Sequence, residues 1–330
     1  MKANTSVFIT GATGFVGSHL AAELAERGAR VRALVRATSD VSRLSGLGAE
    51  LVRGSLEDAE ALARGVEGAE IVFHLAAVTH ARTEADYVRA NAAGTRALVE
   101  AVLGAKQRPR RLVYLSSLAA VGPALDGRPV GRDDPPRPLT AYGRSKLEGE
   151  RACLAAATDG LETVALRAPA VYGPGDREML RFFRLAARGL FPLPAGGERV
   201  VQLVHVTDLA RALVAAGAAE AARGVYHVAE PKAYTWTEVA AHMAKAVGRG
   251  VRIVRIPRPA VMAAAALSEW AAKIGGGATM FNREKARELL APGWLCETET
   301  LRRDTGFEAR IAVPDGLAAT AAWYREQGWL

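Results

Sequence analysis

Three glycines near the start of the chain, Gly11, Gly14 and Gly17, stand between a short apolar run and an amphipathic stretch. In a strand–turn–helix unit each of them has a physical role. Gly11 permits the tight turn, Gly14 lets the backbone approach a phosphate group, and Gly17 lets the helix lie close to the sheet. The N–H groups at the positive end of that helix then attract an anion. The spacing predicts a dinucleotide site, and a purely structural glycine-rich turn is the alternative.

The first half of the chain alternates apolar runs with amphipathic stretches. The apolar runs predict buried strands at residues 7–10, 31–35, 50–52, 71–75, 112–116 and 163–167. Helical periodicity predicts helices at residues 15–27, 57–64, 87–103 and 142–157. Strands that alternate with helices imply right-handed crossovers and an α/β fold, a doubly wound parallel sheet of the Rossmann type.

The second half of the chain is less regular. We expect helices at residues 208–219, 236–247, 259–274 and 283–290, a strand at 225–228, and a glycine break at 275–277. Loops rich in Pro and Gly are expected at 122–138, 173–175 and 191–197. We predict a Rossmann domain of residues 1–170, to which residues 201–232 return. Residues 171–200 and 233–330 then form a smaller C-terminal substrate-binding lobe.

Charge and composition narrow the partners of the chain. The 330 residues carry a net charge of +8, but the basic residues are scattered, whereas nucleic-acid binding favours basic clusters interleaved with aromatic residues. Only Arg108, Arg110 and Arg111 form a tight group, which we expect at a solvated helix-to-strand turn. The six histidines and two cysteines show no metal-ligand spacing. We therefore expect no nucleic-acid partner and no metal.

Two further patterns bear on location. The longest apolar stretch, residues 259–274, carries Glu269 and Lys273 and is shorter than the ~20 residues that a membrane span needs. Residues 7–10 are too short for the apolar part of a signal peptide. Cys153 and Cys296 imply no disulfide framework. These features predict a cytoplasmic protein without a membrane span.

A tyrosine and a lysine lie four residues apart after a proline-rich loop, and this spacing puts Tyr142 and Lys146 on one helical face. A phenol has a pKa near ~10, which is too high for efficient proton exchange at neutral pH. A fixed ammonium nearby favours the phenolate and lowers that pKa. The lysine can also hold a nicotinamide ribose. The pair predicts an acid–base centre.

Other motifs complete the pattern, and they are Phe73-His74-Leu75-Ala76-Ala77, Asn91-Ala92-Ala93-Gly94-Thr95, Ser116-Ser117 and Leu166-Arg167-Ala168-Pro169. Together with the glycine spacing they resemble extended short-chain dehydrogenases of the NAD-dependent epimerase/dehydratase superfamily, especially dihydroflavonol reductase and 3β-hydroxysteroid dehydrogenase-like members. The resemblance implies that Ser117 orients the substrate oxygen toward Tyr142. It also implies that Asn91 holds the active-site backbone and a bound water, so Ser117, Tyr142, Lys146 and Asn91 form the catalytic set.

The same resemblance implies the residues of the cofactor site. They are Gly11, Thr13, Gly14, Phe15, Val16, Gly17, Arg36, Ser55, Leu56, Leu75, Ala76, Ala77, Tyr142, Lys146 and Pro169. We interpret Ser116 as a structural residue that lines the nicotinamide site. We interpret His74 as a locally bonded core histidine, and His205 and Asp208 as structural residues of a later turn.

The choice of cofactor depends on Arg36, which follows the second predicted strand where NAD-binding folds usually place an acidic residue. A guanidinium suits a 2′-phosphate, and Thr38, Ser39 and Arg43 offer further donors. NADP is therefore expected, NADPH being preferred and NAD the alternative. A surface arginine that happens to follow a strand is the other interpretation. Ser55 replaces the family's usual Asp, which predicts a weaker adenine contact.

These residues predict an NADP-dependent oxidoreductase that interconverts a carbonyl and a secondary alcohol on a largely apolar small molecule. The resemblance implies that nucleotide-sugar enzymes carry an Asn and an Arg at the positions of Ala170 and Val201. A nucleotide-sugar epimerase or dehydratase, with Arg181, Arg184 or Arg258 compensating, is one alternative. A non-catalytic NADP-sensing protein is another. Helices 87–103 and 142–157 form a dimer interface in the family, which suggests a homodimer.

Overall fold

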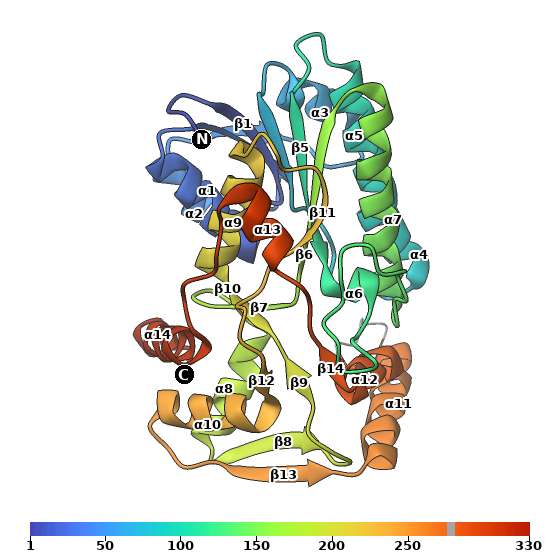
Figure 1. Cartoon of the computed structure of the whole chain (residues 1–330), viewed down its shortest axis with the longest axis vertical. Helices are drawn as coiled ribbons and strands as arrows, with labels where there is room; N and C mark the ends of the chain where they lie inside the picture. The colour runs from blue at the N-terminus through green and yellow to red at the C-terminus, as the bar shows by residue number, and fades with distance from the viewer. Residues whose placement is uncertain (276–280) are drawn as a thin grey trace.

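Seven parallel strands form the central sheet of the protein, whose computed structural model describes residues 1–275 and 281–330. The strand order is β11-β6-β5-β4-β1-β2-β3 (Figure 1). Their bounds are β1 (Ser6–Thr10), β2 (Arg30–Val35), β3 (Glu50–Arg53), β4 (Ile71–His74), β5 (Arg111–Ser117), β6 (Glu162–Ala168) and β11 (Gly224–His227). The order reverses between β1 and β4, so the predicted doubly wound Rossmann-type fold is confirmed.

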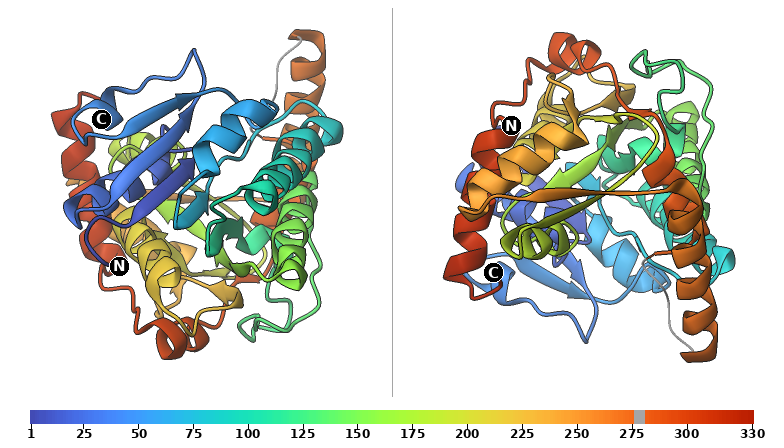
Figure 2. Two further views of the ribbon diagram at one scale, coloured as in Figure 1. Left: turned by 90° about the horizontal axis from the view of Figure 1, so that it is seen from above. Right: turned by 90° about the horizontal axis from the view of Figure 1, so that it is seen from below.

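Helices cover both faces of this sheet and bury the apolar side chains of its strands. On one face α1 (Phe15–Glu26) and α9 (Val206–Ala218) pack into a core with Ile9 and Phe73. On the other, α3 (Ala59–Val66), α5 (Gly94–Gly104) and α7 (Ala141–Ala155) pack around Phe8 and Tyr114. Figure 2 shows both layers end on. Strands buried on two faces explain why the sequence has continuous apolar runs instead of alternation.

The predicted helix 87–103 has a more complex form. It starts as α4 (Glu84–Tyr87), where Thr83 and Asp86 form a capping box, continues as a π-helix (Val88–Ala93), and then becomes α5. The start was missed because a capping box specifies a helix end through side-chain bonds to the backbone, not through apolar periodicity. Asn91 lies in this π-helical segment, and its side chain accepts a hydrogen bond from the backbone of Val78 in the preceding loop.

The lower part of the molecule in Figure 1 is built from short strands and several helices. The strand pairs are β7 (Ala170–Tyr172) with β10 (Leu203–His205), and β8 (Leu190–Pro194) with β13 (Arg252–Ile256). β9 (Val200–Val201) lies between β12 (Tyr234–Thr235) and β14 (Gly293–Trp294). The helices α8 (Met179–Ala187), α10 (Trp236–Val247) and α14 (Val313–Glu326) share a core, whereas α11 (Arg258–Gly275) and α12 (Arg283–Leu290) form a small cluster of their own.

The loop expected at residues 191–197 and the glycine break expected at 275–277 both lie in this part of the chain. The loop predicted at 191–197 is wrong over its first half, because residues 191–194 belong to β8. Prolines are tolerated there since β8 pairs on one side only, with β13. The expected break at 275–277 lies partly outside the described residues, and α11 includes Gly275.

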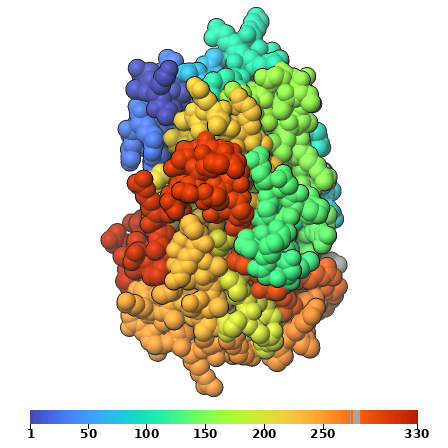
Figure 3. All heavy atoms as spheres, in the orientation of Figure 1, coloured from blue at the N-terminus to red at the C-terminus, as the bar shows by residue number. Residues whose placement is uncertain are grey.

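Segments far apart in sequence meet at the junction of the two parts. The segment 201–232 contributes α9 and β11 to the Rossmann sheet and its core. Leu301 of α13 (Glu299–Thr305) also belongs to that core, although it lies in the segment 233–330. In the space-filling view the red C-terminal segment lies across the junction on this face (Figure 3). The division of the chain into two domains at the stated residues stays a prediction.

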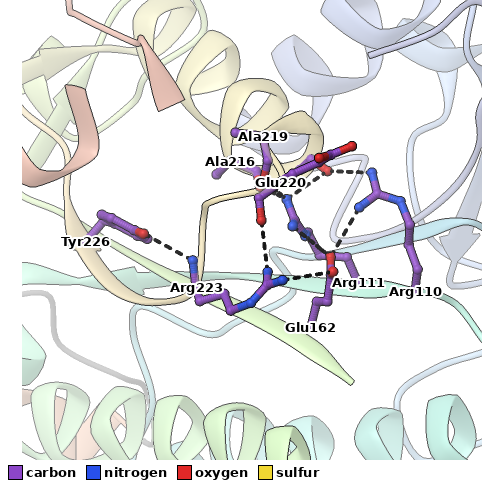
Figure 4. Close-up of polar contacts among 9 residues, drawn as sticks. Arg110, Arg111, Glu162, Ala216, Ala219, Glu220, Arg223 and Tyr226 are labelled. Atoms are coloured by element: carbon purple, nitrogen blue, oxygen red, sulfur yellow. Dashed lines mark hydrogen bonds and ion pairs between the residues drawn. The ribbon is translucent and has the colours of Figure 1, made fainter. Parts of the chain in front are cut away.

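The expected solvated arginine group is wrong for Arg111, whose side chain is fully buried at the amino end of β5. Its guanidinium pairs with Glu162 at 2.7 Å (Figure 4). It also donates to carbonyl oxygens at the end of α9, those of Ala216, Gly217 and Ala219. The last carbonyls of a helix lack partners within it and attract a cation, so Arg111 fastens α9 to the sheet. Arg108 and Arg110 are exposed, as expected.

No helix in residues 1–275 or 281–330 is both long enough and apolar enough to span a membrane.

Replacement of Arg111 by Ala should lower the free energy of unfolding by about 3 kcal/mol. It leaves the buried carbonyl groups at the end of α9 without a donor and removes the buried partner of Glu162. Urea denaturation measures the loss. Arg223→Ala is the control, since Arg223 is an exposed partner of the same Glu162 at 3.4 Å, and its loss should cost less than about 1 kcal/mol. Equally small losses in both variants would contradict the role assigned to Arg111.

Candidate active site

The sheet brings the predicted cofactor residues to one edge. Gly11 follows β1, Arg36 follows β2, Ser55 lies just beyond β3, Leu75 follows β4 and Pro169 follows β6. Because all these strands are parallel, these residues lie along the carboxyl edge of the sheet in the order of its strands. The glycine turn lies next to the point where that order reverses. An α/β sheet of this kind binds its ligand at such a switch point.

The glycine turn forms a close backbone cradle. Gly11 has a φ of +79°, and a Cβ there would lie 2.6 Å from the backbone nitrogen of Ala76. A Cβ on Gly17 would collide with the carbonyl oxygen of Gly11. Gly14 is the N-cap of α1 and supplies no side-chain cap, so the N–H groups of the first turn, which include those of Phe15 and Val16, remain available to an anion. These features fit a pyrophosphate.

The predicted adenosine end of the site contains the guanidinium of Arg36. Arg36 is exposed, and its guanidinium makes no hydrogen bond or ion pair within the described part of the chain. Arg43 is directed elsewhere, since it donates to Ser18 Oγ at 3.3 Å and lies against Gly175. The Ser55 hydroxyl accepts a hydrogen bond from the backbone of Glu57 at 3.2 Å. Of the expected phosphate donors, Arg36 is therefore the guanidinium that is free.

The N-terminus of α7 positions the predicted acid–base pair. The Thr140 hydroxyl accepts from the backbone of Gly143 at 3.1 Å and caps the helix, which sets Tyr142 in its first turn. Lys146 follows one turn later and is buried. Its Nζ donates to the carbonyl oxygen of Leu115 at 2.8 Å and lies 4.1 Å from the ring centroid of Tyr114. The lysine is therefore anchored to β5, the strand that ends in Ser117.

The structure places Ser117, at the end of β5, near Tyr142, where the Ser117 hydroxyl acts to lower the Tyr142 pKa. The Ser117 hydroxyl also accepts from the backbone of Ala119 at 3.1 Å and caps the short helix α6 (Leu118–Val121). The structure therefore shows Ser117 as a strand-end cap, and its role in orienting the substrate oxygen toward Tyr142 stays a prediction. A hydroxyl that accepts from a backbone N–H keeps its own proton to donate.

The expected lowering of the Tyr142 pKa is not found in this structure. Burial raises the pKa of Tyr142 to about 12, against the opposing hydrogen bond from Ser117. Burial also lowers the pKa of Lys146 to about 7, so the ammonium is only partly populated at neutral pH. Desolvation disfavours the charged form of both groups and is the largest cause of each shift. Tyr142 is consequently protonated near neutrality, the state of a proton donor.

Asn91 links the loop after β4 to the catalytic helix. Its Oδ1 accepts from the backbone of Val78 at 2.8 Å, and its Nδ2 donates to the Val78 carbonyl at 3.0 Å and to Ser145 Oγ at 2.9 Å. All the polar groups of this buried amide are thus occupied by protein atoms. The geometry accounts for the expected hold on the active-site backbone.

The histidine and aspartate residues interpreted as structural have that role. His74 is buried between Thr10 Oγ1 at 2.6 Å and Thr95 Oγ1 at 2.9 Å, and burial lowers its pKa to about 3. His205 accepts from the backbone of Thr207 and caps α9. Asp208 accepts from two backbone N–H groups at residues 310 and 311. These side chains hold the sheet and its connections together.

A buried carboxylate beside Lys146 was missed at the sequence level. Glu150 lies one turn beyond Lys146 and forms a bidentate pair with Arg167, at 2.6 and 3.0 Å. It also accepts from Ser116 Oγ at 2.6 Å, and its charge acts to raise the pKa of Lys146. The repeat Tyr142-x-x-x-Lys146-x-x-x-Glu150 was the signal, because a carboxylate on a buried helical face requires a partner.

Helix α12 covers the site from the C-terminal part of the chain. A small pocket beside Tyr142 is lined by Thr79, His80, Tyr87, Thr140, Tyr142, Asn282, Glu284, Lys285 and Glu288. Glu284 accepts from the backbone of Ala141 at 2.7 Å, and Glu288 accepts from Thr140 Oγ1 at 3.1 Å. Carboxylates at the positive end of α7 are favourable. No periodicity or motif predicts this contact, because it depends on tertiary placement.

The apolar residues of α11 do not line this pocket. Val261 and Ala265 are buried against Ala286 of α12, and Met262 is partly buried beside them. These residues belong to the small apolar core between α11 and α12. Leu267 and Trp270 are exposed. Within the described residues, no group of three His, Cys, Asp or Glu side chains is placed to hold a metal ion.

A doubly wound sheet with a glycine cradle at its switch point is the architecture of an NAD(P)-dependent enzyme of the extended short-chain dehydrogenase type. The chain belongs to the NAD dependent epimerase/dehydratase family, whose sequence model matches residues 7–229.

Comparisons with individual proteins agree with this assignment. The chain is 36% identical to the ceramide reductase of Caulobacter vibrioides, over 98% of this chain and 96% of that one. It is 30% identical to the 4-hydroxy-2-methyl-3-oxo-4-farnesyl-3,4-dihydroquinoline-1-oxide ketoreductase of Stigmatella aurantiaca, over 94% of each. Among solved structures, MoeE5 in complex with UDP-glucose and NAD has a TM-score of 0.77 and 29% identity, over 98% of this chain and 99% of that one. The chain is an NAD(P)-dependent oxidoreductase of carbonyl and alcohol groups.

Proposed function

We propose that the chain is an NADP-dependent reductase of a largely apolar carbonyl compound, with Ser117, Tyr142 and Lys146 at its catalytic centre. One observation carries this proposal. The Tyr142 phenol, which burial keeps protonated, lies near Ser117 at the carboxyl edge of the sheet, and α12 closes a small pocket over it. The arrangement suits transfer of a proton to an oxygen that enters between the two hydroxyls.

The bound nicotinamide would supply the hydride to the carbonyl carbon. The Ser117 hydroxyl donates a hydrogen bond to the carbonyl oxygen and orients it toward Tyr142. As negative charge develops on that oxygen, Tyr142 donates its proton, and the alcohol leaves. Lys146, held by the Leu115 carbonyl and by the charge of Glu150, stabilises the phenolate that remains. Asn91 holds the loop after β4 against helix α7 through its hydrogen bonds to Val78 and Ser145.

The site is poorly suited to a nucleoside diphosphate. Ala170 has no donor, and Val201 is buried in the apolar core of the lobe, so the two positions that resemble diphosphate contacts are apolar. Lys285 also lines the pocket, but it is paired with Glu288 at 2.8 Å, so this lysine is not a free cation for a diphosphate. The names of the ceramide reductase and the farnesylated-quinoline ketoreductase support a substrate with a long apolar part.

Two other functions, a nucleotide-sugar enzyme and a non-catalytic NADP sensor, are less well supported. The likeness to MoeE5 bound to UDP-glucose and NAD favours a nucleotide-sugar enzyme as the second candidate. An NADP sensor without turnover is disfavoured because the chain retains Tyr142 in the pocket and Lys146 anchored one turn away on the same helix. A homodimer through α5 and α7 and a cytoplasmic location stay predictions.

Replacement of Tyr142 by Phe should lower kcat by about 10²-fold or more, because it removes the proton donor and keeps the ring. Cofactor binding, measured by fluorescence titration, should be nearly unchanged. Tyr87→Phe is the matched control, since its ring lies 6.1 Å from that of Tyr142 in the same pocket and its hydroxyl donates to the backbone of Thr79. If Tyr142→Phe retains more than about a tenth of the activity, Tyr142 is not the acid.

Replacement of Arg36 by Asp should invert or abolish a preference for NADPH. A carboxylate repels the 2′-phosphate, and hydrogen bonds to a charged group contribute about 1.5–3 kcal/mol each, so NADPH affinity should fall by more than about tenfold. Titration of both cofactors against both proteins measures this. Arg30→Asp, at the opposite end of β2, is the control. Equal affinity of the unaltered protein for NAD and NADP would contradict the assignment of Arg36.

The substrate class is tested by competition. The NADPH-loaded protein should reduce long-chain ketones, followed at the nicotinamide absorbance, and should not bind UDP-sugars at micromolar concentration. Product analysis identifies the alcohol. Micromolar binding of UDP-sugars without reduction of any ketone would replace the proposal with the nucleotide-sugar function.

A further inference from the structure

We propose that the outer face of α11 docks on a bilayer surface that carries anionic lipid, and so presents the active site to an apolar substrate held in the membrane. The proposal rests on the proposed function for its substrate, but the docking surface is argued from the structure alone. We define this surface as Leu267, Trp270 and Ile274 together with the exposed arginines Arg252 and Arg287.

The apolar part of the surface is a stripe on one side of a helix. Leu267, Trp270 and Ile274 are 64%, 62% and 68% exposed, and their spacing of three and four residues sets them on the same face. The opposite side of the helix is used, because Val261 and Ala265 are buried against α12. Three large apolar side chains exposed together are unusual on a protein surface and indicate a binding surface.

The neighbouring strands extend this surface. β13 leads directly into α11, and Val254 of β13 and Leu190 of its partner β8 are also exposed. In Figure 1 these strands and α11 lie together at the end of the molecule farthest from the Rossmann sheet, and Figure 2 shows α11 projecting beyond the body. Of the six large hydrophobic side chains exposed in the described residues, five lie in this region and Leu125 is the sixth.

Charge identifies a membrane as the occupant. Residues 249–290 contain eight basic and three acidic residues, which account for most of the net charge of +8 of the whole chain. Arg252 and Arg287 are exposed, and their guanidiniums have no hydrogen-bond or ion-pair partner among residues 1–275 and 281–330. A second copy would bring the same positive charge to a symmetric contact, which like charges disfavour. An anionic bilayer complements both the arginines and the apolar stripe.

The surface is coupled to the active site through α12. Ala286 on one side of α12 packs against α11, and Asn282, Glu284, Lys285 and Glu288 line the pocket beside Tyr142. Docking of α11 therefore places α12, which covers the catalytic pocket, one helix layer from the bilayer surface. An apolar carbonyl compound held in the bilayer is thereby brought close to the pocket beside Tyr142.

The experiment uses flotation of the full-length protein with vesicles of phosphatidylcholine and phosphatidylglycerol in a 3:1 ratio. The unaltered protein should float with these vesicles, and binding should weaken as salt rises from 50 to 500 mM, since salt screens the arginines, with a Debye length of about 10 Å at 0.1 M. The triple variant Leu267→Ser, Trp270→Ser and Ile274→Ser should bind at least about tenfold more weakly, because it loses the three apolar side chains that enter the bilayer on docking.

A matched control separates the stripe from general surface hydrophobicity. Leu125→Ser removes an equally exposed leucine, 60% exposed, from a loop outside the docking surface, and it should leave vesicle binding unchanged. Trp270→Phe should keep binding but lose most of the blue shift in tryptophan emission that vesicles induce in the unaltered protein. The shift then reports insertion of this one ring among the five tryptophans of the chain.

The possible results separate docking from catalysis. Failure of the unaltered protein to bind vesicles, or equal binding by the triple variant, would overturn the docking proposal, even if detergent-solubilised ketones are reduced. Conversion of a dimer to a monomer by the triple substitution, without vesicle binding, would make this face a contact between copies and would also overturn it. Vesicle binding by a protein that reduces no ketone would leave docking supported and would count against the proposed function.

Discussion

The close backbone packing at the first turn is the constraint on which the rest of the site depends. Gly11, Gly17 and the backbone of Ala76 approach so closely that a Cβ at either glycine would collide with a neighbouring backbone atom. This approach brings the N-terminus of α1, with its uncapped N–H groups, to the carboxyl ends of β1 and β4. The parallel strands then align every later loop along the same edge. Arg36 and Ser117, at the ends of β2 and β5, both lie at this edge.

The electrostatics of the catalytic helix follow from burial. Tyr142, Lys146 and Glu150 occupy successive turns of one face of α7, where desolvation acts on all three. Glu150 is compensated by Arg167 and Ser116, whereas Lys146 has a single carbonyl partner, so the lysine loses much of its preference for the charged state. Tyr142 stays neutral for the same reason. The resulting site holds a proton ready for donation, which suits reduction.

The C-terminal part of the chain completes the site by an electrostatic contact rather than by a large apolar interface. Helix α12 places Glu284 and Glu288 against the N-terminus of α7, where free N–H groups and the helix dipole favour a negative charge. The α11–α12 pair has its own small apolar cluster, separate from the main cores. The cover of the pocket is thus tied to the catalytic helix mainly through polar groups, and the other side of the pair faces solvent.

Much of this architecture could be read from the sequence. Local patterns specify the glycine turn, the buried strands and the Tyr142–Lys146 spacing, because each depends on chemistry within a few residues and on the regular periods of helices and strands. The parallel order follows from alternation of strands and helices. For this reason the Rossmann-type sheet and the positions of Gly11, Arg36 and Ser117 at its edge needed no long-range information.

Tertiary structure alone decided the features that depend on burial and on distant partners. The pKa of Tyr142 has the opposite shift to the one expected, because desolvation is a property of the folded surroundings and not of the Tyr–Lys spacing. Arg111 is buried because the end of α9, about a hundred residues away, supplies the carbonyl groups that compensate its charge. Likewise, α12 reaches Tyr142 only through the fold. A charged or polar side chain takes its character from its neighbours, and those neighbours exist only once the chain has folded.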